Sequence, residues 1–301
     1  MTGTALLALI ALGTVGGAHL LSKARWTWTM PRAGIALWQA LGLAWGVATI
    51  GALLGYALLP YGQGITGGIP AALADGAARM EVHHLAALLS GVGLTVVLLA
   101  VLVYALVRME RARRRHRALL ELVAGQNAAV PGTLVLDHPA AAAYCVPGVR
   151  SSKVVVSAGT LELLDADELA AVLAHERAHA RERHDLVLLP FASLRHAFPQ
   201  IRLVDRCLDA VELLIEMAAD DRARRHRSPR ELATALLRFA AARPVAAPSG
   251  ALSVAGDQPA VLARVDRLLR PTPPHRGIRA ATLIAIPLLA VVPFLLYHLP
   301  V

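Results

Sequence analysis

Four long apolar segments constrain the fold of this chain more than any other feature. Each is free of Asp, Glu, Lys and Arg and approaches or exceeds the ~20 residues that a helix needs to cross a bilayer. The chain is 56% hydrophobic and only 17% charged, which is too apolar for an ordinary soluble domain. The first segment could be a signal peptide, but no basic residue precedes it, so we interpret it as a span. We predict a multi-pass α-helical membrane protein with spans at residues 4–21, 35–59, 85–107 and 280–297.

Positively charged residues between the spans predict the orientation. The loop after the first span carries Lys23, Arg25 and Arg32, whereas the next loop carries only Arg79. Because Lys and Arg are enriched in cytoplasmic loops, the first loop is predicted to be cytoplasmic. By alternation we expect three transmembrane helices in residues 1–107, a cytoplasmic domain in residues 108–279 and a fourth transmembrane helix in residues 280–301.

A cluster of six arginines follows the third span directly. A net charge of +9 would attract nucleic acid, but no aromatic residues that could stack on bases interleave with this cluster. A membrane span adjoins it, so we assign it to topology and to anionic lipid headgroups. We therefore expect the lipid bilayer, and no direct nucleic acid, as a partner. The third span is predicted to continue as a cytosolic helix that packs on the next domain through Leu119, Leu120, Leu122 and Val123. The arginines are Arg108, Arg111, Arg113, Arg114, Arg115 and Arg117.

A metal-binding pattern stands inside the predicted cytoplasmic domain. In His175-Glu176-Arg177-Ala178-His179 the two histidines are four residues apart and therefore share one face of a helix. Zinc accepts imidazole ligands in tetrahedral geometry, and a glutamate beside them can reach a water in an open position. The pattern indicates metal-assisted hydrolysis, most often of a peptide bond, with Zn²⁺ as cofactor and Glu176 as catalytic residue.

The residues around this pattern favour a helix. Apolar residues recur at helical spacing through residues 169–178, and Asp165 followed by Glu168 forms a capping-box start. The helix is predicted to run toward Pro190.

A third ligand is expected from a second amphipathic helix, residues 201–226. Glu212, Glu216 and Asp220 lie at successive four-residue steps on one stripe of this helix. One interpretation is a solvated acidic face opposite the many arginines. The interpretation that we favour is that Glu216 completes a His, His, Glu site and that Asp220 orients a ligand histidine.

The cytoplasmic segment is predicted to be α+β. Residues 133–136, 141–146 and 154–157 have the pattern of short strands, the last two joined by a turn at Pro147-Gly148. A small sheet of this kind can offer one edge to an extended peptide. Either residues 154–157 or residues 141–145 could form this edge, and plain core strands without a ligand are a third possibility. Residues 241–256 and 270–274 are predicted to be flexible connections. The predicted substrate-binding residues are Val155, Val156 and Ser157.

Two other residue types are not assigned to a metal. Cys145 and Cys207 fit no paired-metal spacing and are predicted to be small core residues without a disulfide. His184, in the cluster Arg183-His184-Asp185, is assigned to a local salt-bridge and capping role.

The combined motifs resemble those of the membrane-bound gluzincin peptidases. The resemblance is strongest toward antirepressor peptidases of the BlaR/MecR type, with HtpX-like and CaaX prenyl-protease peptidases as near neighbours. It implies a gluzincin domain inserted in a four-helix protein of the bacterial inner (plasma) membrane. It also implies His175, His179 and Glu216 as zinc ligands, Glu176 as general base, and Asp220 as hydrogen-bond partner of His175. The motifs are residues 147–148, 154–159, 168–176, 183–185 and 216–220.

The expected function is that of an integral-membrane zinc metalloendopeptidase. Its substrate is expected to be a cytoplasmic or membrane-proximal protein, and the resemblance suggests a transcriptional repressor cleaved in signal transduction. In the antirepressor sensors a penicillin-binding domain follows the last span, whereas this sequence stops at Val301, so the resemblance does not extend to sensing β-lactams. Arg222, His226 and Tyr144 are candidates for a second oxyanion donor. The sequence leaves the oligomeric state open, a homo-oligomer included.

Two hypotheses from other classes compete with a peptidase. One is a catalytically silent scaffold or signal transducer that keeps the fold and a structural zinc ion. Such a site closes its fourth position with Cys or His, and none is spaced to do so. The other is a transporter or channel, which is disfavoured because none of the spans carries a charged residue.

Overall fold

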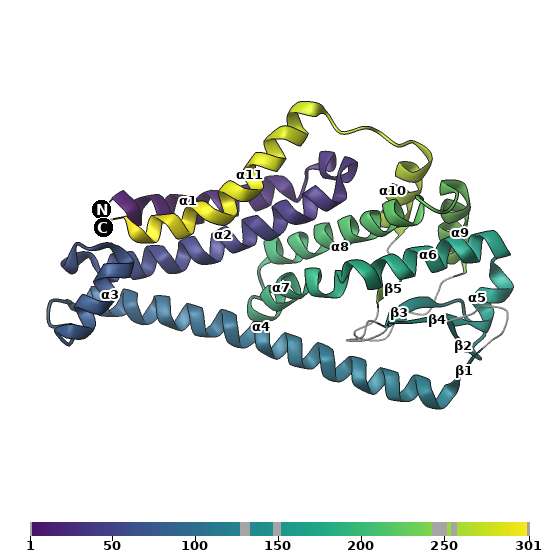
Figure 1. Ribbon diagram of the computed structural model, residues 1–301, viewed down its shortest axis with the longest axis horizontal. Coiled ribbons are helices and arrows are strands. Elements are labelled where there is room, and N and C mark those ends of the chain that lie inside the picture. Colours follow the sequence, from purple (N-terminus) through teal and green to yellow (C-terminus); the bar gives the residue numbers. More distant parts are fainter. Residues whose placement is uncertain (1, 127–132, 147–151, 243–251, 254–257, 300–301) are drawn as a thin grey trace. The chain divides into compact units, whose positions relative to one another are not determined.

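The structure is a computed structural model that describes residues 2–126, 133–146, 152–242, 252–253 and 258–299 (Figure 1). The chain divides into two compact units. The first comprises Met1–Val101, Leu194–Cys207 and Pro274–Val301, and the second comprises Leu102–Ser193 and Leu208–Pro273. Residues 194–207 therefore group with the apolar unit, which the sequence analysis did not anticipate.

Apolar helices make up the first unit. In Figure 1, α1 (Thr2–Leu21) and α11 (Arg276–Leu295) run along α2 (Pro31–Ala57). A methyl group added at Gly51 of α2 would lie 2.4 Å from the ring of Tyr297, whose hydroxyl donates a 2.7 Å hydrogen bond to the Val47 carbonyl. The small residue therefore permits this close packing. The shorter helices are α3 (Gly64–Ala74), η1 (Arg25–Thr29), η2 (Leu59–Tyr61) and η3 (Leu296–His298).

Four helices of the described residues are long and apolar enough to cross a membrane. They expose large apolar side chains, among them Leu12, Leu89 and Ile284, which a bilayer would cover. This arrangement supports a membrane-bound protein, as the sequence predicts. The four candidate spans are Gly3–Leu21, Pro31–Ala57, Val82–Glu121 and Arg276–His298.

Helix α4 (Val82–Val123) continues well past its apolar part, as predicted. In the second unit Arg113 forms a buried ion pair with Asp185, and His116 Nε2 lies 3.1 Å from the Tyr144 hydroxyl. Leu120 is buried against the sheet, but Leu119 is 58% exposed, so the predicted packing of Leu119 is wrong. The reason is helical geometry, since neighbouring residues point to different faces. The side chains of Leu122 and Val123 lie outside the described residues.

A five-stranded sheet forms one layer of the second unit. Its order is β1-β2-β4-β3-β5, with β2 and β4 parallel and the other pairs antiparallel. The predicted strands are present, while the predicted turn at Pro147-Gly148 lies outside the described residues. The strands are β1 (Ala124–Gln126), β2 (Thr133–Leu136), β3 (Ala143–Val146), β4 (Lys153–Ser157) and β5 (Leu252–Ser253).

The predicted substrate-binding edge is wrong. Strand β4 is interior, because Val155 pairs with Leu134 of β2 on one side and with Tyr144 of β3 on the other. Val155, Val156 and Ser157 are all buried, and their strand has no free edge for a peptide to join. The alternative edge, β3, pairs with β5 through Tyr144 and Cys145.

Helices of the second unit cover the sheet and enclose the core with it (Figure 1). Gly159, just after β4, permits a close approach, because a methyl group there would lie 2.0 Å from the Pro139 carbonyl oxygen. The core includes Val154, Val156, Val172, Leu236, Phe239, Val261 and Val265. The helices that lie wholly within this unit are α5 (Ala158–Leu163), α6 (Ala166–Glu182), α9 (Pro229–Ala241) and α10 (Gln258–Leu269). Helix α7 (His184–Ala197) ends, and helix α8 (Arg202–Ala223) begins, among residues 194–207, which group with the first unit.

The helix that carries the metal-binding pattern begins as predicted but ends early. Asp165 and Glu168 form the capping box of α6. The helix stops at Glu182 because Arg183 adopts a left-handed conformation with φ of 50°, and α7 starts at His184. The prediction of one helix running toward Pro190 is therefore wrong. Pro190 lies inside α7.

Candidate metal centre

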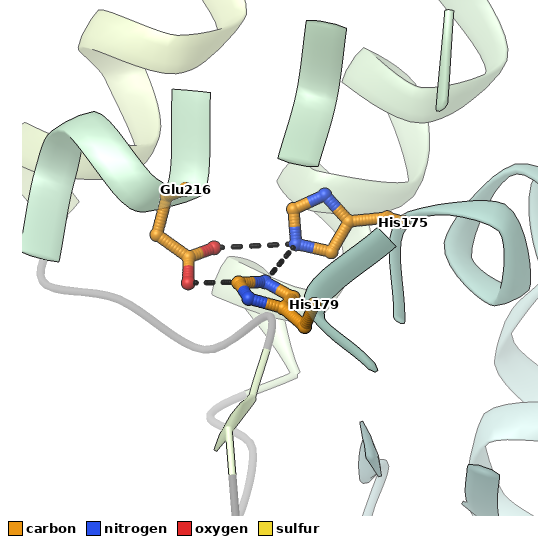
Figure 2. A group of neighbouring side chains, drawn as sticks. All are labelled: His175, His179 and Glu216. Carbon is orange, nitrogen blue, oxygen red and sulfur yellow. Dashed lines mark hydrogen bonds and ion pairs between the residues drawn. The ribbon is translucent and has the colours of Figure 1, made fainter. Parts of the chain in front are cut away.

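Three predicted ligands converge in the second unit. His175 and His179 lie on α6, and Glu216 reaches them from α8 (Figure 2). The Nε2 atoms of the two histidines are 3.0 Å apart. The Glu216 carboxylate oxygens lie 3.3 Å from His175 Nε2 and 3.4 Å from His179 Nε2. The structure thus brings together the His, His, Glu set that the sequence predicts.

The acidic stripe on α8 is not a uniformly solvated face. Glu212 is exposed, the Glu216 side chain is 20% exposed, and Asp220 is fully buried. The stripe therefore runs from solvent into the protein along the helix. Its inner two members, Glu216 and Asp220, contact the α6 histidines, which excludes the interpretation of a uniformly solvated acidic face.

The geometry of this donor set fits one zinc ion. Ligand atoms bound at 2.0–2.1 Å in tetrahedral directions lie about 3.3 Å from one another. The two Nε2 atoms are 3.0 Å apart, His175 Nε2 lies 3.3 Å from Oε2 of Glu216, and His179 Nε2 lies 3.4 Å from Oε1 of the same carboxylate. With one ligand atom taken from each residue, the three atoms all lie within 4.8 Å of one another. Two imidazoles and a carboxylate are also the donor types of hydrolytic zinc sites that keep a fourth position open. Among the described residues, this is the group of His, Cys, Asp and Glu that could hold a metal ion.

Asp220 orients the first of these histidines. Its Oδ1 lies 2.9 Å from His175 Nδ1, and both side chains are fully buried. A carboxylate at Nδ1 attracts the ring proton to that nitrogen and leaves Nε2 with its lone pair toward the cluster. This is the position that the sequence analysis predicts for Asp220.

Arg264 of α10 is a member of the site that sequence reasoning missed. Its Nε and Nη2 donate to the two carboxylate oxygens of Asp220 at 2.9 and 2.7 Å. Its Nη1 lies 2.9 Å from Glu216 Oε2, and its side chain is 1% exposed. A usable signal was present, since Arg264 lies on the apolar stripe of α10 between Val261 and Leu268. A lone arginine on a buried stripe requires an acidic partner.

Glu176 lies next to the cluster without a side-chain partner. Among the described residues, neither carboxylate oxygen of Glu176 makes a hydrogen bond of good geometry. The Cys145 backbone nevertheless lies close enough to act against the rise in the pKa of Glu176. Burial raises the pKa of Glu176 to about 8. A buried carboxylate with a pKa near neutrality is suited to proton transfer.

The charges of Glu216 and His179 suit metal binding, which requires ionised carboxylates and unprotonated imidazoles. Burial alone would raise the pKa of Glu216, but Arg264 and the histidines lower it to about 2. Burial lowers the pKa of His179 to about 3. Burial also disfavours the charged form of His175, but hydrogen bonds to Asp220 and Glu216 raise its pKa to about 9, so a metal ion competes with a proton there.

Other predicted residues lie elsewhere. In the described part of the chain, no hydrogen bond or ion pair joins Arg222, His226 or Tyr144 to the cluster, and the Tyr144 hydroxyl faces His116. Cys145 is buried, while Cys207 is partly buried, and both thiols are free. The sequence predicts a local salt-bridge and capping role for His184 in the cluster of residues 183–185. In the structure His184 lies 3.4 Å from Glu182 and 2.9 Å from His179, and the sequence analysis named neither contact.

An α+β unit with two buried histidines, the carboxylate of Glu216 beside them and an adjacent buried glutamate has the residues of a metallopeptidase centre. The described part of the chain also carries four long apolar helices. Residues 109–242 match the family model described as Peptidase family M48. This match supports a metallopeptidase of the M48 family, whose members are zinc enzymes, and together with the apolar helices it indicates a membrane-bound protein. No solved structure matches the chain. The match includes every predicted site residue, while Arg264 lies beyond it.

Proposed function

We propose that this protein is an integral-membrane zinc metalloendopeptidase whose centre consists of His175, His179 and Glu216. The observation that carries the proposal is the juxtaposition of the His175, His179 and Glu216 donor set with the buried carboxylate of Glu176, which has no side-chain partner among the described residues. A silent scaffold would have no use for such a carboxylate, because burying it without a partner costs free energy.

The chain's own residues supply binding and proton transfer. His175, His179 and Glu216 would hold Zn²⁺, which when bound polarises a scissile carbonyl and acidifies a water. Glu176 accepts a proton from that water and later delivers it to the leaving amine. Asp220 and Arg264 keep the ligands in place, since Arg264 contacts both Glu216 and Asp220.

We propose a protein substrate on the cytoplasmic side of a bacterial inner membrane. The basic residues that follow the third span support this side. A transcriptional repressor is the substrate that the resemblance to BlaR/MecR-type peptidases favours, which would place the protein in signal transduction.

The proposal is tested with full-length protein purified in detergent. Metal analysis should find about one zinc per chain, and incubation with a peptide library should give cleavage products detectable by mass spectrometry. Removal of zinc with a chelator should stop cleavage, and added Zn²⁺ should restore it. Cleavage that persists at full rate in zinc-free protein would contradict the proposal.

A further inference from the structure

His184, a third buried histidine, contacts the predicted ligand His179 through the ring nitrogen that does not face the cluster. Nδ1 of His184 lies 2.9 Å from Nδ1 of His179, and the two rings meet edge to face. We propose that His184 is a positioning residue, which accepts a hydrogen bond from Nδ1–H of His179 and so keeps Nε2 of His179 available to the metal. This inference rests on the proposed function, because it concerns the same centre.

The chemistry of two facing imidazole nitrogens supports this direction. Two neutral rings with Nδ1 atoms 2.9 Å apart form a hydrogen bond only if one of these atoms carries a proton and the other does not. If His184 were the donor, the proton of neutral His179 would be on Nε2. That nitrogen faces His175 and Glu216 and could not then bind a metal. Only the arrangement with His179 as donor agrees with the ligand set.

Glu182 favours the required form of His184. Its Oε2 lies 3.4 Å from Nε2 of His184. A carboxylate accepts hydrogen bonds and cannot donate them, so it attracts the ring proton of His184 to Nε2. Nδ1 of His184 is then an acceptor for His179. The three residues form a chain of donors and acceptors that runs from the carboxylate of Glu182 to the ligand nitrogen of His179.

The helix break at Arg183 is what permits this contact. In an uninterrupted α-helix a residue five positions further on is rotated by about 140°, so residue 184 would face away from His179. The left-handed conformation of Arg183, with φ of 50°, turns the chain instead. Such a conformation is uncommon for a residue with a side chain and persists where the surroundings impose it. Here the buried pair of Asp185 with Arg113 anchors the chain directly after His184.

The test compares two variants of full-length protein in which side chains of similar size replace His184. His184→Asn provides an amide oxygen that can accept a hydrogen bond from Nδ1–H of His179, whereas His184→Leu provides a side chain of similar size that cannot. Zinc affinity is measured by competition with a chelator, and the ligand field by absorption of the Co²⁺-substituted protein. We expect His184→Leu to lower zinc affinity by about 10 to 100-fold and to change the Co²⁺ spectrum. His184→Asn should retain most of the affinity and the wild-type spectrum.

Two further variants sharpen this comparison. Glu182→Ala should lower zinc affinity less than His184→Leu, because water can replace a carboxylate that is 22% exposed. His138→Leu, which removes an exposed imidazole of the same unit, should leave zinc affinity unchanged.

Each outcome decides for or against the role of His184. Wild-type affinity in both His184 variants, or an equal loss in both folded proteins, overturns it. If His184→Leu does not fold, retained affinity in His184→Asn together with a loss in Glu182→Ala supports the role, and any other pattern contradicts it. A wild-type protein that binds no zinc would remove the proposed function and this inference with it.

Discussion

At the level of single residues, the centre combines two carboxylates, Glu216 and Asp220, with the buried cation Arg264. Glu216 and Asp220 would be costly to bury as isolated carboxylates, and Arg264 offsets this cost by contacting both. Asp220 in turn fixes His175. His175 and Glu216 therefore each depend on a neighbour outside the three-residue cluster.

The assignment of the third ligand gives the first prediction. Glu216→Ala should lower zinc affinity and peptide turnover severely, because it removes one of three ligands. Glu212→Ala, one turn earlier on the same helix and exposed, should leave zinc content nearly unchanged. Zinc stoichiometry and turnover of the two variants decide the matter. Loss of metal in Glu212→Ala with retention in Glu216→Ala would show that the ligand is assigned one turn too late.

Asp220 should have an intermediate effect. Asp220→Ala removes a carboxylate that orients His175 but leaves the three ligands in place. Removing such a partner costs about 10 to 100-fold in metal affinity or activity. Chelator competition measures this loss. A decrease as large as that of Glu216→Ala would indicate that Asp220 binds the metal directly.

Arg264 gives a prediction about stability. Arg264→Ala leaves the fully buried Asp220 without its cation, and breaking a buried ion pair in this way costs about 3–5 kcal/mol. Arg270→Ala, near the end of the same helix, removes an exposed pair with Asp266 and should have almost no effect. Denaturant unfolding in detergent compares the two variants. Equal stabilities would mean that water, and not Arg264, compensates the charge of Asp220.

The predictability of the site differs from residue to residue. His175, Glu176 and His179 follow from their spacing, and Glu216 with Asp220 from one helical stripe. Arg264 and the contact of His184 did not follow. Arg264 is 44 residues beyond Asp220, and this pairing depends on how α10 packs. The His184 contact depends on the conformation of Arg183, which no sequence pattern marks.

Among the helices and strands, the sequence predicted the elements that depend on interactions between neighbouring residues. The capping box of Asp165 and the periodicities of α6 and α8 are such signals, and these helices are present. Strand order is not local, so alternation could not show that β4 lies between β2 and β3. Helix α10 was not predicted, because the residues that precede it in the sequence are rich in Ala and Pro and indicate a flexible connection.

The junction of β4 and α5 gives a prediction at this scale. Gly159→Ala should destabilise the second unit by about 1–3 kcal/mol, because the added methyl group meets backbone that must shift. Gly277→Ala is the control, since a methyl group there meets only the His275 side chain at 3.5 Å. Thermal unfolding in detergent measures both. A Gly159→Ala protein as stable as the control would show that Pro139 moves without cost.

At the scale of the whole molecule, orientation across the membrane remains a prediction from basic residues. The four apolar helices are present, but their length and composition do not show which side faces the cytoplasm. We expect a reporter inserted between residues 242 and 252 to report the cytoplasm, because the arginines after the third span should stay on that side. An alkaline phosphatase fusion, which is active only outside the cytoplasm, provides the opposite readout. Phosphatase activity there would invert the orientation.

In the proposed mechanism Glu176 acts on a water, whereas His175, His179 and Glu216 act on the metal. Glu176→Gln separates these two roles, because the amide keeps the shape of the side chain but cannot accept a proton at neutral pH. We predict that purified Glu176→Gln protein retains zinc at the wild-type stoichiometry and loses peptide cleavage. A folded variant that loses its zinc, or one that still cleaves at the wild-type rate, would contradict the account.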